Sequence, residues 1–248
     1  MSPSVIASLL GAVAVLLVLA SIAGQLAKFV LGHEYLEGLV PLFYVDNEFN
    51  IPTLFSVLLM LFSAVLLAVI TLLSGRRRAP HVSKWAILSI GFFLMACDEG
   101  LQYHERLILP IRALLGDSDL GIYYFAWVIP GIALVLVSAL FFMRFLLHLP
   151  TATRLRFMMA ATLYIGGVIG MELFAGRLTE LDSEVHTSRA FFLPLMITTV
   201  EESLEMAGVI IFIWALLVYI ADTYKEVRFR FEGVRGEVTI DDPQRPSK

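Results

Sequence analysis

Long apolar runs constrain this chain more than any other feature of its sequence. Runs such as residues 5–27 and 52–74 contain no acidic or basic side chain until their ends. A helix needs about 20 such residues to cross a hydrocarbon core of about 30 Å. The chain is also 58% hydrophobic and only 16% charged, whereas soluble domains carry about 25% charged residues. The sequence therefore predicts an integral membrane protein.

The runs are too long and too evenly apolar for barrel strands, so we predict an all-α, polytopic membrane helix bundle. Six spans are expected, at about residues 4–28, 52–74, 84–105, 122–148, 156–176 and 191–221. They define a transmembrane domain over residues 1–221, followed by a tail over 222–248 that we expect to be partly disordered. The first run exceeds the usual length of a signal-peptide core and is interpreted as a retained span.

The distribution of basic residues predicts the orientation in the membrane. Arginine and lysine gather between the second and third spans, between the fourth and fifth, and after the sixth. The other connections carry most of the acidic loop residues. Because basic loops stay on the cytoplasmic side, both termini are expected in the cytoplasm of a bacterial inner membrane.

Acidic residues inside three of the predicted spans are the second unusual feature. A carboxylate at the bilayer centre costs about 2.5–3.5 kcal/mol even on insertion scales, so such residues face the bundle interior and need partners. The predicted topology brings these acids to overlapping depths in the outer half of the bilayer. They are Asp98 and Glu99 in the third span, Glu172 in the fifth, and Glu201, Glu202 and Glu205 in the sixth.

Helical spacing gathers these acids into stripes. Glu201 and Glu205 lie about 40° apart around a helix, and Asp98, Gln102 and Glu105 fall within about 60° of one another. Two stripes on different helices can face each other inside a bundle. Protons, hydrogen bonds or a cation would then neutralise them. Side chains expected to support the site or to lie on its access route are Glu48, Asn50, Gln102, Tyr103 and Glu105.

Carboxylates with a single histidine indicate a hard metal ion, because oxygen ligands favour manganese, magnesium, calcium or iron over zinc or copper. Iron or manganese is the cofactor that this hypothesis favours. The candidate ligands are Asp98, Glu99, His104, Glu172, Glu201, Glu202 and Glu205. The sequence lacks the histidines of an intramembrane zinc hydrolase, and nothing in it indicates nucleic-acid binding.

Local signals in the chain predict smaller features. Asn50 is a candidate helix cap, with Pro52 in the first turn that follows. Gly166 and Gly170 have the small-xxx-small spacing that lets helices approach closely. Cys97 is the only cysteine, so an intrachain disulfide is excluded. We expect its side chain to pack inside a helix.

Three motifs, NIPTLFS from Asn50, CDEGLQYHERL from Cys97 and TVEESLEMAG from Thr199, resemble those of a group of uncharacterised bacterial inner-membrane proteins. That group carries N-[IL]-P-T-x-[FY]-S, LDE…HE and EE-x-x-E. Here Cys97 replaces the leucine and Leu54 stands where an aromatic residue is usual, and neither change removes a polar group. The resemblance covers residues 46–219 and implies an architecture and a residue set, but no activity.

Three functions remain open from the sequence. The first is a metal-binding membrane protein, such as a carboxylate-bridged oxidoreductase acting on a lipid-soluble substrate. The second is a proton or cation transporter with a path opening past Glu48, although the inner halves of the spans look purely apolar. The third is an accessory subunit that contacts other membrane subunits. Membrane lipids are expected partners in each case.

Overall fold

A computed structural model describes residues 1–29, 42–43, 50–116, 120–185 and 192–224, and the regular structure in these ranges is helical throughout. Predicted residue Glu48 and the tail beyond Tyr224 lie outside them. The long helices are α1 (Pro3–Phe29), α3 (Ile51–Arg76), α4 (Val82–Leu101), α6 (Val128–His148), α7 (Thr151–Ile165), α8 (Glu172–Val185) and α9 (Phe192–Tyr224). Shorter elements are η2 (Glu105–Leu107), α5 (Ile108–Leu115), η3 (Gly121–Tyr123) and the π-helix η4 (Gly166–Met171).

Five helical stretches in the described ranges are long and apolar enough to cross a membrane. They are 3–28, 51–76, 128–148, 151–179 and 196–224, and they indicate a multi-pass membrane protein. The predicted third span is the exception. α4 has 20 residues, but Lys84, Asp98 and Glu99 lie within it. It also ends at Leu101, whereas the sequence predicted a helix to residue 105.

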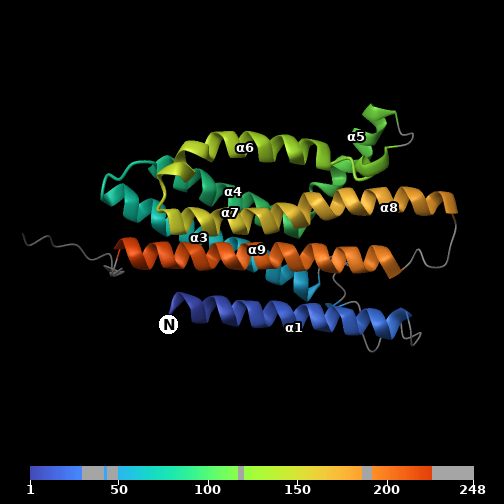
Figure 1. Ribbon diagram of the computed structural model, residues 1–248, viewed down its shortest axis with the longest axis horizontal. Helices are drawn as coiled ribbons and strands as arrows, with labels where there is room; N and C mark the ends of the chain where they lie inside the picture. The colour runs from blue at the N-terminus through green and yellow to red at the C-terminus, as the bar shows by residue number, and fades with distance from the viewer. Residues whose placement is uncertain (30–41, 44–49, 117–119, 186–191, 225–248) are drawn as a thin grey trace, which may run out of the picture.

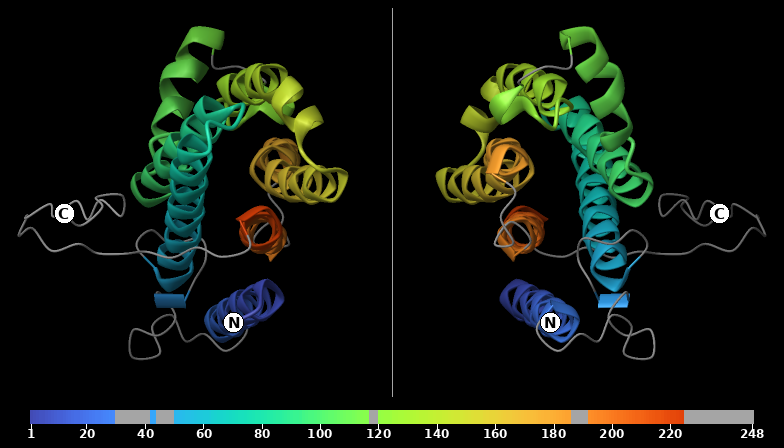
Figure 2. Two further views of the ribbon diagram at one scale, coloured as in Figure 1. Left: turned by 90° about the vertical axis from the view of Figure 1, so that its left-hand side faces the viewer. Right: turned by 90° about the vertical axis from the view of Figure 1, so that its right-hand side faces the viewer.

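The helices run lengthwise in an elongated bundle, while α5 stands away from it (Figure 1). Viewed end-on, α9 lies between α1 on one side and α7 and α8 on the other, and α3 and α4 close the flank (Figure 2). α3 and α4 form the most extensive helix pair. We call the end where α3 and α9 begin and α4 ends the site end, and the opposite end the closed end.

The first turn of α3 confirms the predicted capping signal. The Oδ1 atom of Asn50 accepts a hydrogen bond of 2.7 Å from the backbone N–H of Thr53. Pro52 lies in the same turn, where a missing backbone donor costs nothing. This cap fixes where α3 begins at the site end.

The closed end has an apolar core. Trp85 packs edge-on against Phe145, with ring centroids 4.8 Å apart, and also lies 5.0 Å from the Tyr219 ring. Leu67, Ile70, Ile213 and Leu216 are fully buried beside them. Aliphatic and aromatic side chains therefore fill most of this end, where Ser74 and Tyr224 also share a buried hydrogen bond of 2.7 Å.

A π-helix joins α7 to α8, and its glycines correct one prediction. A Cβ atom at Gly166 or Gly170 would meet nothing within 4 Å, so these two glycines do not mediate the close approach. A Cβ atom at Gly167 would instead lie 2.9 Å from Cγ of Glu205 and 3.0 Å from the carbonyl oxygen of Glu201. The π-turn shifts the register by one residue, so Gly167 contacts α9.

Candidate functional site

The end of α4 is shaped by Asp98. Its backbone carbonyl accepts a 2.6 Å hydrogen bond from the N–H of Gln102, a residue in the left-handed conformation (φ 49°, ψ 46°). Its side chain turns the other way: Oδ1 accepts the backbone N–H of His104 at 3.0 Å, and Oδ2 lies 2.8 Å from Nδ1 of the same residue. The carboxylate of Asp98 therefore stabilises the turn that follows α4 and also orients the imidazole of His104.

His104 connects this turn to two other elements through Trp127. The two ring centroids are 4.7 Å apart. The indole N–H of Trp127 donates a 3.0 Å hydrogen bond to Oε1 of Glu172, at the start of α8. Trp127 is only 8% exposed. It was not among the predicted site residues, because its partners lie 23 and 45 positions away along the chain and no local spacing relates them.

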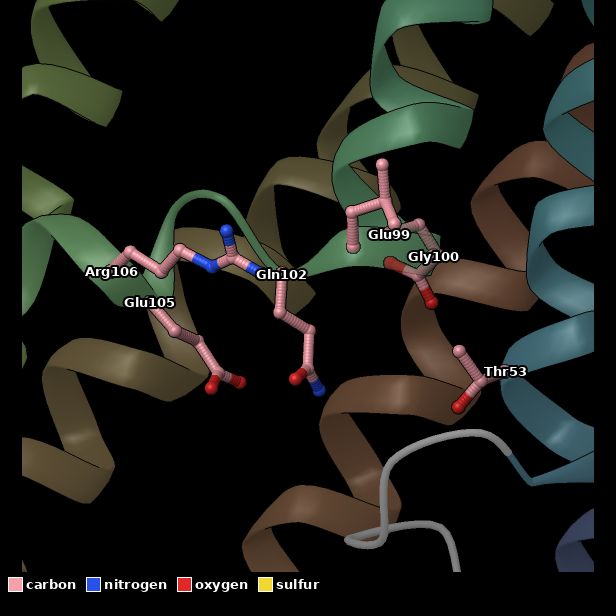
Figure 3. A pocket seen from close by; sticks show the side chains of 7 residues that line it. Thr53, Glu99, Gly100, Gln102, Glu105 and Arg106 are labelled. Carbon is pink, nitrogen blue, oxygen red and sulfur yellow. The ribbon is translucent and has the colours of Figure 1, made fainter.

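A cavity of about 290 Å³ opens beside the broken end of α4. Figure 3 shows the carboxylates of Glu99 and Glu105 and the amide of Gln102 projecting toward the same side of this segment, with Thr53 of α3 opposite. The Arg106 guanidinium stands on the wall and lies over the Tyr103 ring, 5.2 Å from its centroid. Irregular backbone at membrane depth is tolerated where it lines such a cavity.

Ser56 lies one turn further along α3 from Thr53. It is 4% exposed, and its hydroxyl has no hydrogen-bond partner within the part of the chain that the structure describes. Most buried polar atoms in proteins have a partner, so an unpaired hydroxyl at this position is unusual.

Glu205 is the most deeply buried of the described acids of α9, with 8% of its surface exposed. Gly167 of the π-helix packs directly on it, and Glu201 and Glu202 are half-buried. One turn earlier, the Ser203 hydroxyl donates to the carbonyl of Thr199 at 2.6 Å. The predicted stripe of α9 thus faces the junction of α7 and α8.

Ser21, Gln25 and Thr199 form a polar layer between α1 and α9 that the sequence did not lead us to predict. Nε2 of Gln25 donates to the hydroxyl of Thr199 at 2.9 Å and to that of Ser21 at 3.2 Å. Gln25 and Ser21 are 3% and 0% exposed. An amide inside an otherwise apolar helix is a signal that could have placed Gln25 among the site residues.

The predicted metal ligands do not form one cluster. Among the described residues, no group of three or more histidine, cysteine, aspartate or glutamate side chains is arranged to hold a metal ion. Several of these acids make contacts of their own instead. Asp98 holds His104, Glu172 accepts from Trp127, Glu99 lines the cavity, and Glu205 packs on Gly167. The seven-residue ligand set is therefore unsupported as a unit.

The residues that were expected to support the site or its access route lie in different places. Gln102 and Glu105 line the cavity as expected. Asn50 is 4% exposed and its Oδ1 atom caps α3, while its place on an access route stays a prediction. Tyr103 is 50% exposed and lies under Arg106.

This arrangement supports two kinds of chemistry. A histidine whose Nδ1 is held by a carboxylate can exchange a proton at Nε2. Carboxylate, amide and hydroxyl oxygens around one cavity are ligands that hard cations prefer. Both groups lie at the same end of the bundle.

The comparisons with known proteins concern the whole membrane domain. No curated protein and no solved structure matches the chain. One family model matches residues 9–220, a range that contains the Asp98–His104 pair, the cavity and the α9 acids. Because this match covers most of the sequence, the chain belongs to the family described as a domain of unknown function, DUF8692.

Proposed function

We propose that the protein exchanges protons for a small hard cation across the bacterial inner membrane. The observation that carries the proposal is the cavity of about 290 Å³ lined by Glu99, Gln102 and Glu105, beside the Asp98–His104 pair. With the basic loops in the cytoplasm, this cavity opens toward the outer side.

The lining of the cavity supports cation binding. Glu99 and Glu105 supply negative charge, while Gln102 and Thr53 supply neutral oxygen atoms on the same cavity. Arg106 on the wall limits how much positive charge the cavity can hold, because two cations in low dielectric repel each other strongly. A monovalent or divalent ion with several oxygen ligands fits these side chains.

Proton exchange is supported by the neighbouring histidine. Asp98 occupies Nδ1 of His104, so proton uptake and release take place at Nε2. Glu105 follows His104 in the chain and lines the cavity. A cation that enters the cavity therefore changes the electrostatic potential at the imidazole, and this couples cation binding to proton release.

The backbone supports movement at the same place. Transporters place their binding sites at interrupted helices. Here α4 is broken at Gln102, and a π-helix separates α7 from α8 immediately before Glu172. The apolar core around Trp85, Phe145 and Leu216 closes the opposite end. Access from one side at a time is the property that an alternating-access carrier requires.

The other two functions have less support. A carboxylate-bridged oxidoreductase with iron or manganese requires ligands that the described residues do not bring together. An accessory role in a membrane complex stays a prediction, since no observation here favours it over transport.

Proton flux across the membrane of proteoliposomes tests the proposal. The purified protein is reconstituted with a pH-sensitive dye inside, and NaCl, KCl, MgCl₂ or MnCl₂ is added outside under a fixed membrane potential. We expect one cation to drive proton flux, and Glu99→Gln or Glu105→Gln to reduce the flux by about tenfold or more. Asp222→Asn is the matched control, because Asp222 is an exposed acid at the closed end of α9.

Two results would overturn the proposal. One is a folded, inserted wild type that gives no cation-dependent flux. The other is a flux that persists undiminished in Glu99→Gln and Glu105→Gln, which would separate transport from the cavity.

A further inference from the structure

A second cavity lies between α1 and α9. It measures about 340 Å³ and is almost wholly apolar. Glycine, alanine and branched aliphatic side chains line it, with Ser203 as the one hydroxyl-bearing residue. Val15 and Leu19 on one edge are 59% and 56% exposed, so the crevice opens sideways to the medium around the bundle. In a chain of membrane-length helices, that medium is the acyl region of the bilayer.

The crevice has a polar layer at one end. α1 and α9 run antiparallel (Figure 1), and Gln25 of α1 meets Thr199 of α9 through a 2.9 Å hydrogen bond. Moving away from that contact, the crevice passes Ser203 and continues to Ile211 on α9, and to Gly11 on α1. Eight residues of helix correspond to about 12 Å. The shape is therefore an apolar slot about 12 Å long, with the buried polar layer beyond one end.

The two helices are too close for another helix to occupy the slot. The side-chain contact between Gln25 and Thr199 holds α1 on α9, whereas a helix with its side chains is about 10–12 Å across. Small residues such as Gly11, Ala14 and Ala207 line the crevice and leave a narrow space between the two helices. A single hydrocarbon chain needs no more width than that.

We propose that the crevice is a binding site for one acyl chain of a membrane phospholipid, which enters from the exposed edge at Val15 and Leu19. The chain lies along Val18, Met206 and Ile210. The site is separate from the cavity that carries the proposed transport, because Glu99 and Glu105 do not line it.

Two glycines provide a matched test. A Cβ atom at Gly11 or at Gly91 would meet nothing within 4 Å, so a side chain can be added at either without a clash. Gly11 lines the crevice, whereas Gly91 lies on α4 and does not. Gly11→Leu fills the slot, and Gly91→Leu adds the same atoms elsewhere. Val15→Phe fills the slot from its exposed edge and serves as a second variant.

The measurement is native mass spectrometry of the protein during stepwise delipidation, with thermal unfolding recorded in the same detergent. We expect wild type and Gly91→Leu to retain about one phospholipid molecule, and Gly11→Leu and Val15→Phe to lose about 90% of that occupancy while staying folded, a tenfold change in binding.

Equal retention in all four proteins would identify annular lipid only and overturn the proposal. A wild type without retained lipid, or one that retains a quinone in place of a phospholipid, would also overturn it. Proton flux measured on Gly11→Leu keeps the two proposals apart, since the variant leaves the cation cavity unchanged.

Discussion

The carboxylate of Asp98 binds His104 twice, through the backbone N–H at 3.0 Å and through Nδ1 at 2.8 Å. The two residues are six positions apart. In a continuous helix, residues six apart lie about 120° apart around the axis and about 9 Å apart along it. The double contact is therefore possible only because α4 ends at Leu101 and Gln102 adopts the left-handed conformation. The helix break and the acid–base pair are one structural feature.

We predict that Asp98→Asn reverses the tautomer of His104. The amide oxygen can still accept the backbone N–H, but the amide nitrogen then donates to Nδ1, so the imidazole proton moves to Nε2. With that proton at Nε2, uptake at the exposed nitrogen is blocked, and proton flux should fall by about 100-fold or more. Flux in proteoliposomes and ¹⁵N NMR of the imidazole test this together. An unchanged tautomer with normal flux would contradict it.

Removing a single N–H from Trp127 should destabilise the site end. Trp127→Phe keeps a ring against His104 but removes the donor to Glu172. A part-buried carboxylate that loses a donor costs about 1–3 kcal/mol of unfolding free energy. Denaturation in mixed micelles measures the change.

The control for this variant is Trp214→Phe. Trp214 carries Arg156 over its ring at 4.7 Å, an interaction that phenylalanine also provides. We expect a loss below about 1 kcal/mol there. Similar losses in both variants would mean that the hydrogen bond to Glu172 contributes nothing.

Glycine positions in the bundle should differ sharply in their tolerance of alanine. At Gly208 a Cβ atom would lie 2.8 Å from the backbone nitrogen of Tyr164 and 2.9 Å from the carbonyl oxygen of Ala160, and neither atom can rotate away. Gly208→Ala should therefore separate α7 from α9 and cost about 1–3 kcal/mol. Gly166→Ala meets open space and should change stability by less than about 1 kcal/mol. Thermal unfolding that ranks the two variants in the opposite order would refute this packing.

The sequence predicted the helical membrane architecture because apolar run length and charge placement are local properties. The starts of α1, α3 and α9 and the Asn50 cap were predicted to within a few residues. The end of α4 was not, because the break depends on the side chain of Asp98 reaching His104, and that contact has no apolar-periodicity signal. The π-helix was missed for a similar reason: one inserted residue changes the register without changing composition.

The sequence marked the acidic residues of the candidate site but not their partners on other helices, and their depth in the bilayer stays a prediction. Glu99, Gln102 and Glu105 line one cavity, whereas the predicted stripe joined Asp98, Gln102 and Glu105. Pairing across helices could not be predicted, since Trp127 reaches Glu172 and Gln25 reaches Thr199 over long separations. Those partners give Glu172 and Gln25 contacts of their own. The described residues show no group of three or more side chains arranged to hold a metal ion, so the metal site stays a prediction.

Gln25 should be the residue that fixes α1 to the bundle. It donates to Ser21 and Thr199, whereas most of the apolar surface of α1 is not buried in the bundle. Gln25→Leu keeps the volume but removes both hydrogen bonds, each worth about 0.6 kcal/mol on average in a membrane. We expect a loss of about 1 kcal/mol and faster separation of α1, measured by steric trapping with labels on α1 and α9.

Leu26→Ala supplies the comparison for that experiment. Leu26 neighbours Gln25 but is 45% exposed, so truncating it removes apolar atoms that face the bilayer and not α9. Lipid tails are as apolar as leucine, so this change should leave the separation rate of α1 nearly unaltered. If Leu26→Ala loosened α1 as much as Gln25→Leu, apolar contact and not the polar layer would hold α1 on α9. The Ser21–Gln25–Thr199 layer beyond the end of the crevice would then not position the two helices.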